Sequence, residues 1–369
     1  MSVRRVAVSS LGRGAKVDHA SGYLRVVDLE RSAVTFKTPV PESRWRKEDP
    51  NPRGGTRGAR GIAVHGDRFV VGTHEDITVL DSRWSLVRRF THPILSSVHD
   101  VLADDRGILV SCTRGDSVAR FDWEGELVDW WALGADRALA KALNLHMVRP
   151  FDPSADYRDP RIDLQGWSTT HLNGLGRGGA GILVSLGRVS DRRKIVRGPF
   201  RKQPRPDPAS YAIVALPPDG QLRDAAATIV LHRTDLPVEA PNHNPAQDGD
   251  LVLYNDSNRN SFVVWDLAAG REVHAVPIPG DPPFARGLLR LRPGRWLVGS
   301  QKPLALYEVD IEAGEIVATH DLQGDPEETV YAIGELPDRF EDPRPVTGSD
   351  PYAFWKRAHL SGDITPIPN

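Results

Sequence analysis

The feature that most constrains the fold is a sequence motif that recurs along the chain. It consists of a short apolar strand, a turn with Asp and Gly, a second apolar strand ending in small polar residues, and a third strand ending near Asp; a fourth strand follows. The copies begin at Arg60, His99, His171, His243 and Arg286. Four antiparallel strands in about 40 residues are typical of one blade of a β-propeller.

The two ends of the chain supply a sixth blade. Residues 330–336 have the pattern of a lone first strand, and three strands within residues 4–36 have the pattern of strands that lack a first one. Pairing the ends would close the ring without an exposed edge. We therefore expect an all-β, six-bladed β-propeller over residues 1–338, with its closing blade shared between residues 1–40 and 328–338.

Two insertions and a tail interrupt this plan. Residues 133–167 contain helix formers with apolar positions three and four apart, which predicts a short amphipathic helix. Residues 188–209 hold a strongly basic stretch, either a solvated surface loop or a lid for an anionic substrate. Residues 339–369 are expected to form a C-terminal strap that lies on the ring.

Charge and hydropathy exclude several classes of partner. Lys and Arg number 47 against 49 Asp and Glu, so no overall basic field would draw the chain to nucleic acid or to an anionic membrane. No run reaches the roughly 18 apolar residues of a membrane span, and the first residues lack a signal-like apolar segment. A cytoplasmic location is expected, and the one cysteine, Cys112, is expected to be a core residue.

Alignment of the repeats places His99, His171 and His243 in one column at the start of the first strand, the strand that lines the channel of a propeller. Arg60 and Arg286 occupy the same column in the neighbouring blades. This arrangement predicts a site at one mouth of the channel.

A second column lies at the end of the second strand, on the same face, because the two strands run antiparallel. It offers further charged side chains, namely Arg114, Arg188, Asp256 and Lys302. We therefore expect a small, anionic substrate, bound by Arg60, Arg114, Arg286, Lys302 and Asp256.

Three chemistries use converging histidines. The leading hypothesis is one divalent transition metal (Fe, Zn or Mn) ligated by His99, His171 and His243, with lyase, hydrolase or oxygenase activity. Asp100 and Asn173 would then accept hydrogen bonds from the remote ring nitrogens. The histidines can instead act as nucleophile and acid or base beside arginine, or as hydrogen-bonded plugs of an inactive binding propeller. No nucleotide cofactor is expected.

Several short motifs resemble known propellers. The phrases His171-Leu-Asn-Gly-Leu, Asn242-His-Asn-Pro, and Arg286-Gly-Leu with Val298-Gly-Ser-Gln-Lys-Pro resemble a family of uncharacterised bacterial propeller proteins. That resemblance implies the fold and no activity.

A second resemblance covers blades two to four. The phrases Val98-His-Asp-Val-Leu, Thr170-His-Leu-Asn with Val184-Ser-Leu-Gly-Arg, and His243 before Leu251-Val-Leu-Tyr-Asn-Asp resemble the arylsulfate sulfotransferases. These six-bladed enzymes pass a sulfuryl group between phenols through a histidine, without a nucleotide donor. The resemblance implies that His243 is the nucleophile. It also implies a set of groups that hold the sulfuryl oxygens, namely His99, His171, Asn173 and Arg188.

Overall fold

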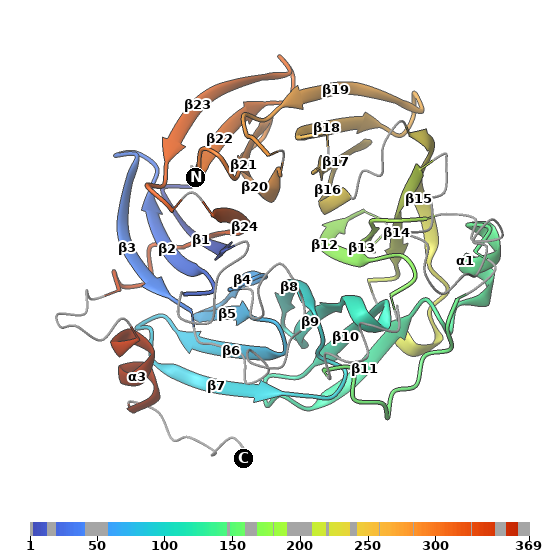
Figure 1. The fold of residues 1–369 in the computed structure, drawn as a ribbon, viewed down its shortest axis with the longest axis horizontal. Helices are drawn as coiled ribbons and strands as arrows, with labels where there is room; N and C mark the ends of the chain where they lie inside the picture. Colours follow the sequence, from blue (N-terminus) through green and yellow to red (C-terminus); the bar gives the residue numbers. More distant parts are fainter. Residues whose placement is uncertain are drawn as a thin grey trace, which may run out of the picture.

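The structure is a computed structural model that describes residues 3–12, 20–40, 58–145, 148–158, 168–179, 181–189, 209–218, 221–236, 242–257, 259–282, 284–325, 327–343 and 352–360. Six four-stranded sheets surround a central axis (Figure 1). All strand pairs are antiparallel, and in each sheet the strands follow one another from the axis outward. The predicted six-bladed β-propeller is confirmed.

The blades are numbered along the chain, and each begins at the axis. Blade 1 contains β4 (Ile62–His65), β5 (Arg68–Gly72), β6 (Asp76–Asp81) and β7 (Leu86–Thr91). Blade 2 contains β8 (Val98–Asp104), β9 (Gly107–Cys112), β10 (Ser117–Phe121) and β11 (Leu127–Ala132). Blade 3 contains β12 (Leu172–Gly178), β13 (Gly181–Leu186), β14 (Ala209–Leu216) and β15 (Thr228–Leu236).

The last three blades follow the same order. Blade 4 contains β16 (Asn242–Asp248), β17 (Leu251–Asp256), β18 (Ser261–Asp266) and β19 (Arg271–Pro277). Blade 5 contains β20 (Arg286–Arg292), β21 (Arg295–Gly299), β22 (Ala305–Asp310) and β23 (Glu315–Asp321). Blade 6 contains β24 (Glu328–Glu335), β1 (Arg5–Gly12), β2 (Tyr23–Asp28) and β3 (Ala33–Pro39).

Blade 6 closes the ring as the sequence predicts. The C-terminal strand β24 pairs with β1, from Val6 opposite Glu335 to Gly12 opposite Glu328. Inside this blade, Nη2 of Arg25 lies 2.5 Å from Oε2 of Glu328, and both side chains are almost fully buried. The ion pair therefore ties β2 to β24 across the join between the two ends of the chain.

The core consists of six apolar clusters, one between each pair of neighbouring blades. Alternate residues of a strand point to opposite faces, so Phe69 and Val71 pack towards blade 6 while Val70 packs towards blade 2. Because both faces of the second strand of a blade are covered, strands such as β9 and β13 are runs of mostly apolar residues without alternation. Cys112 is fully buried in one of these clusters, as predicted.

The insertion at residues 133–167 contains the predicted short helix, α1 (Arg137–Ala142). Asp136 caps its N-terminus by accepting a hydrogen bond from the backbone N–H of Leu139, at 2.9 Å. Leu139 and Leu143 pack into the cluster between blades 2 and 3. Most of the basic insertion, residues 190–208, lies outside the described residues.

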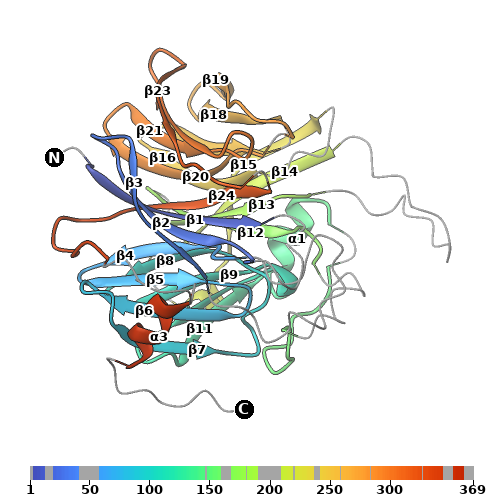
Figure 2. The ribbon, with the colours of Figure 1, turned by 60° about the vertical axis from the view of Figure 1, so that its left-hand side comes forward.

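The C-terminal helix α3 (Ala353–Leu360) lies beside blades 6 and 1 (Figures 1 and 2). Phe354 and Trp355 are buried in the cluster between these blades, and Nε1 of Trp355 donates to the carbonyl oxygen of Pro39 at 2.5 Å. The described part of the expected strap is thus held on the ring by packing and by a hydrogen bond.

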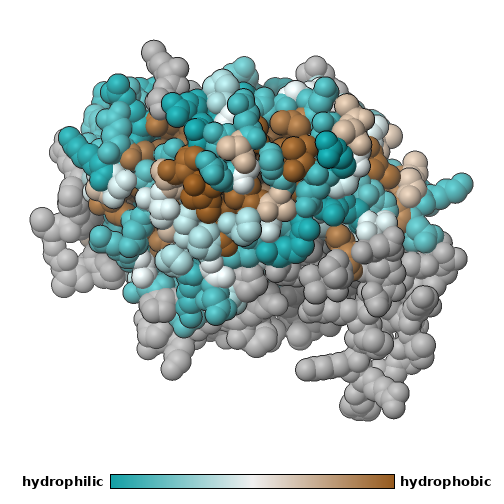
Figure 3. Space-filling model, turned by 90° about the horizontal axis from the view of Figure 1, so that it is seen from above, coloured by the Kyte–Doolittle hydropathy of each residue, from teal (hydrophilic) through white to brown (hydrophobic). Residues whose placement is uncertain are grey.

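The rim of the ring exposes isolated apolar residues. Each of β7, β11, β15, β19 and β23 carries one β-branched side chain between 39% and 47% exposed, namely Val87, Val128, Ile229, Val273 and Val317. Figure 3 looks onto one side of the rim, where apolar residues lie in small groups among hydrophilic ones. Among the described helices, none is long and apolar enough to cross a membrane.

Candidate functional site

A β-bulge near the start of the first strand sets the register at one mouth of the channel. Val98 of blade 2 and Leu172 of blade 3 are equivalent, because each forms the last regular pair before the bulge. His99 follows Val98, and Asn173 follows Leu172. Asn173 therefore occupies the position equivalent to His99, and the predicted column is wrong for His171, which lies just before the strand.

His171 nevertheless meets His99. The two rings lie 5.1 Å apart at an interplanar angle of 80°. His171 is half-buried, and its backbone is left-handed with φ of 54°. A residue other than glycine adopts this conformation only where its surroundings hold it, at a cost on the order of 1–3 kcal/mol.

The hydrogen bonds of His99 fix its tautomer. Its Nδ1 lies 2.7 Å from the carbonyl oxygen of Ser97 and 2.7 Å from Oγ1 of Thr113. The Thr113 hydroxyl donates to the carbonyl oxygen of Leu172 at 2.5 Å, so its oxygen accepts from the imidazole. The proton of neutral His99 is therefore on Nδ1, and Nε2 carries the lone pair.

Burial lowers the pKa of His99 well below its ordinary value of 6.5. Electrostatic interactions with Arg60, His171 and Arg286 lower it further. The His99 ring is therefore neutral near pH 7.

His243 in blade 4 is held in the same way. Its Nδ1 lies 2.6 Å from Oγ of Ser257, and the Ser257 hydroxyl donates to the carbonyl oxygen of Ala285 at 2.7 Å. In both blades the hydroxyl follows its histidine by 14 residues. The shared spacing makes His99 and His243 equivalent, as the sequence predicts.

The other ring nitrogen of His243 faces a cation. Nη2 of Arg286 contacts Nε2 of His243 at hydrogen-bond distance, with both side chains buried. A guanidinium can only donate, so Nε2 must accept and the ring is neutral. The structure thus places a nitrogen lone pair directly against a permanent positive charge.

Tyr331 connects the two arginines to His99. The Arg286 guanidinium lies 4.1 Å from the centre of the Tyr331 ring, and the Arg60 guanidinium lies 6.0 Å from it. The His99 ring lies 5.9 Å from the same ring. These contacts define a mouth cluster of Arg60, His99, His171, His243, Arg286 and Tyr331.

Tyr331 is the member of the mouth cluster that sequence reasoning missed. It lies near the start of β24, the first strand of blade 6, and is the unpaired residue of a bulge in that strand, because Val330 pairs with Ser10 and Ala332 pairs with Ser9. The repeat contains the signal, because an alignment of the first strands at their bulges places Tyr331 after Val330 as His99 follows Val98, in the histidine column.

A buried carboxyl, that of Asp100, follows His99 of the mouth cluster in the sequence. Asp100 accepts hydrogen bonds from the N–H of Val101 at 3.0 Å, the N–H of Leu175 at 3.1 Å and Nδ2 of Asn244 at 3.3 Å. Burial raises its pKa from 3.8 to about 7, against the effect of these donors and of Arg286. Asp100 thus joins blades 2, 3 and 4.

Neither Asp100 nor Asn173 orients His99 or His243, although the sequence suggested that role. Thr113 and Ser257 orient these rings instead. Asn173 is fully buried; its Oδ1 accepts from the N–H of Gly174 at 2.7 Å, and its Nδ2 forms no hydrogen bond with any residue that the structure describes.

The residues of the second predicted column lie in different environments, some exposed to solvent and some buried. Arg188 is exposed, and its N–H donates to the carbonyl oxygen of Thr170 at 2.7 Å, which places it next to His171. Lys302 is exposed. Asp256 is buried and paired with Arg259 at 2.7 Å.

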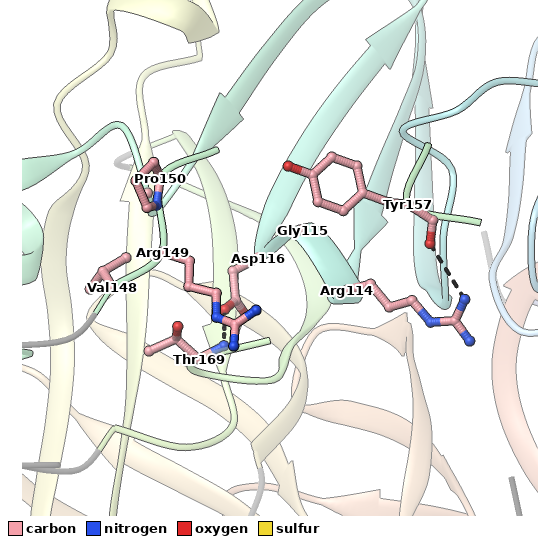
Figure 4. Close-up of a pocket in the computed structure, with 9 residues that line it drawn as sticks. Arg114, Gly115, Asp116, Val148, Arg149, Pro150, Tyr157 and Thr169 are labelled. Atoms are coloured by element: carbon pink, nitrogen blue, oxygen red, sulfur yellow. Dashed lines mark hydrogen bonds between the residues drawn. The ribbon is translucent and has the colours of Figure 1, made fainter. Parts of the chain in front are cut away.

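Arg114 lies outside the mouth cluster. Its Nη1 donates to the carbonyl oxygens of Tyr157, at 3.4 Å, and Arg158, at 2.9 Å. It lines a small pocket beside the channel together with Asp116, Tyr157 and Thr169 (Figure 4). Its side chain is occupied in holding the 133–167 insertion.

The mouth cluster is better suited to an anion than to a metal cation. Within the part of the chain that the structure describes, no three His, Cys, Asp or Glu side chains converge closely enough to hold a metal ion. A dication on Nε2 of His243 would also have to displace the Arg286 guanidinium. No chemical step is therefore assigned to a metal here.

Comparison with known proteins supports the fold alone. No family model matches the chain, and no curated protein matches it. A protein of unknown function from Bacteroides caccae is similar in structure, with a TM-score of 0.53 and 12% identity over 90% of this chain and 98% of that one.

Two further structures are similar. A chain of a nidogen–laminin complex has a TM-score of 0.51 and 10% identity, over 90% of this chain and 98% of that one. A streptogramin B lyase has a TM-score of 0.44 and 13% identity, over 73% and 70%, which is too distant to support any argument.

Proposed function

We propose that the mouth cluster binds a small oxyanionic substrate and transfers its anionic group through Nε2 of His243. The observation that carries the proposal is the contact between Nε2 of His243 and the guanidinium of Arg286. An oxyanion that takes over the donors of Arg286 would release the lone pair of Nε2 and bring its own central atom next to that lone pair.

The electrostatics favour such a substrate. Arg60 and Arg286 are buried, and an oxyanion would neutralise charge in a medium of low dielectric constant, where charge-assisted hydrogen bonds are strong. The guanidinium presents a planar fork of donors that matches two oxygens at once. The same donors would stabilise charge that develops on the oxygens during transfer.

The histidine is prepared for nucleophilic attack. Ser257 accepts from Nδ1–H and thereby keeps the lone pair on Nε2. In the proposed step, Nε2 attacks the sulfur of an aryl sulfate, and the bond between sulfur and the phenolic oxygen breaks. The electron pair leaves with the phenolate, and the sulfuryl group remains on Nε2. A second phenol then attacks the sulfur, loses its proton to solvent and releases neutral His243.

Two features support sulfuryl transfer over other group transfers. The motifs around His99, His171 and His243 resemble those of the arylsulfate sulfotransferases. The rings of Tyr331 and Phe284 also lie beside the Arg286 guanidinium, at 4.1 and 4.7 Å, and would offer apolar surface to a phenol.

Mass spectrometry under non-acidic conditions tests this proposal. We expect brief incubation with 4-nitrophenyl sulfate to release nitrophenol and to add a sulfuryl group to a peptide that contains His243. The His243→Gln variant should show neither change. Nitrophenol release by the wild type with no adduct, and equal release by His243→Gln, would contradict transfer through this histidine.

The binding of a divalent metal by the histidines remains a prediction, which elemental analysis of the purified protein would test. His99 leaves its Nε2 lone pair facing away from Thr113, and the nearby ring of His171 is the second imidazole available. Protein purified without added metal should be compared with the His171→Ala variant. A near-equivalent of Fe, Zn or Mn that is lost in this variant would favour metal chemistry over group transfer.

A further inference from the structure

One carboxylate organises the turn that carries His171. Asp116 lies at the end of a 3-10 turn, η1 (Thr113–Gly115), and is buried. Its oxygens accept from the N–H groups of residues 169, 170 and 172 and from the hydroxyls of residues 168 and 170. Figure 4 shows Asp116 beside Thr169.

The N–H of His171 is joined to the same carboxylate through one intermediate. It donates to Oγ of Ser168 at 2.9 Å, and the Ser168 hydroxyl donates to Oδ1 of Asp116 at 3.0 Å. The backbone donors of residues 169–172 thus all lead to Asp116. This arrangement holds His171 in its left-handed conformation, with φ of 54°.

The η1 turn also holds the other ring of the pair. Thr113 begins the turn and accepts from Nδ1 of His99, and Asp116 follows its end. Asp116 is itself left-handed, with φ of 44°. One short turn of blade 2 therefore fixes His99 through a hydroxyl and His171 through a carboxylate, which sets the two imidazoles 5.1 Å apart.

We propose that Asp116 is a positioning residue that aims His171 at the substrate. The geometric part of this proposal stands on the hydrogen bonds of residues 168–172, and its consequence for turnover rests on the proposed function. A carboxylate is required because every partner is a donor. The Asp116→Asn substitution would turn an amide NH₂ group towards the N–H groups of the turn.

The experiment compares Asp116→Asn with Asp104→Asn. Asp104 is a partly buried carboxylate on β8 whose Oδ1 accepts from Nη1 of Arg120 at 2.8 Å, away from the mouth cluster. Histidine ring signals are recorded by ¹H–¹⁵N NMR, with His171 assigned from the His171→Gln variant. We expect Asp116→Asn to shift or broaden the His171 signals and to leave those of His243 unchanged. Asp104→Asn should leave both unchanged.

Kinetics provide the second readout. Misplacement of a substrate-facing group by about 1 Å can lower turnover about 100-fold, so we expect kcat of Asp116→Asn to fall roughly 10- to 100-fold. We expect KM to change less, because Arg286 remains in place.

Misfolding of the variant and failure of the proposed function can each be distinguished from failure of the positioning role. If Asp116→Asn does not fold, Ser168→Ala removes the acceptor of the His171 N–H and one of the donors to Asp116 while keeping the carboxylate, and the same NMR comparison applies. Unchanged His171 signals in a folded Asp116→Asn protein, or in Ser168→Ala if that variant is needed, would overturn the positioning role. If the wild type turns over no aryl sulfate, the proposed function fails, and the NMR comparison still decides the role of Asp116.

Discussion

Replacing Asp100 with Asn should change how stability depends on pH. Burial raises the pKa of Asp100 from 3.8 to about 7 in the folded protein. Between these two pH values the unfolded chain releases this proton while the folded protein keeps it. The contribution of Asp100 to stability is therefore complete below about pH 4 and is lost as the pH rises towards 7.

The size of the effect follows from the difference in pKa. A difference of about 3 pH units corresponds to about 4 kcal/mol, lost at about 1.4 kcal/mol per pH unit. Asp100→Asn lacks this dependence. It also carries a pH-independent cost of about 1–3 kcal/mol, because the amide cannot accept from Val101, Leu175 and Asn244 together.

Urea unfolding of both proteins at a series of pH values measures the difference. Other buried carboxyl groups are common to the two proteins and cancel. We expect the stability advantage of the wild type over Asp100→Asn to shrink by about 2–3 kcal/mol between pH 5 and pH 7. An advantage that stays constant or grows over this range would refute the argument from burial.

Other substitutions test other parts of the account. Ser257→Ala leaves Nδ1–H of His243 without its acceptor and should lower turnover, with a stability loss of about 1–3 kcal/mol by urea unfolding. Ser300→Ala, a buried hydroxyl that donates to Pro303, is its control and should leave turnover unchanged. Glu328→Gln breaks the buried pair with Arg25 in the closing blade and should cost about 3–5 kcal/mol by the same assay. The ring signals of His99 should show no protonation above pH 6.5, because burial lowers its pKa.

The sequence predicts the ring well because the fold repeats. The second strand of each blade is largely apolar on both faces, and the lone strand at residues 330–336 lacks three partners that the N-terminal strands supply. These signals are local patterns of apolar residues. They survive in every blade because each blade packs against two neighbours in the same way.

The sequence predicts the site less well because matching residue types can outweigh the strand pattern in an alignment. The bulge lies at the same place in blades 2 and 3, and the apolar pairs Val98/Val101 and Leu172/Leu175 align Asn173 with His99, whereas matching the two histidines places His171 there. Arg114 follows Thr113 into the η1 turn, and its guanidinium donates to the backbone of residues 157 and 158. The spacing of 14 residues between a histidine and its hydroxyl is visible in the sequence. Only the pairing of the first and second strands shows that this hydroxyl accepts a hydrogen bond from the histidine ring.

The most direct test of the central claim is isothermal titration of the wild type and of Arg286→Ala with inorganic sulfate and with 4-nitrophenyl sulfate. Arg295→Ala is the matched control, because Arg295 pairs with Asp310 at 2.9 Å away from the mouth cluster. Circular dichroism confirms that each variant is folded. We expect one binding site that weakens with added salt, is lost in Arg286→Ala and is kept in Arg295→Ala. Wild-type protein that binds neither anion, or Arg286→Ala that binds as tightly as wild type, would contradict the claim.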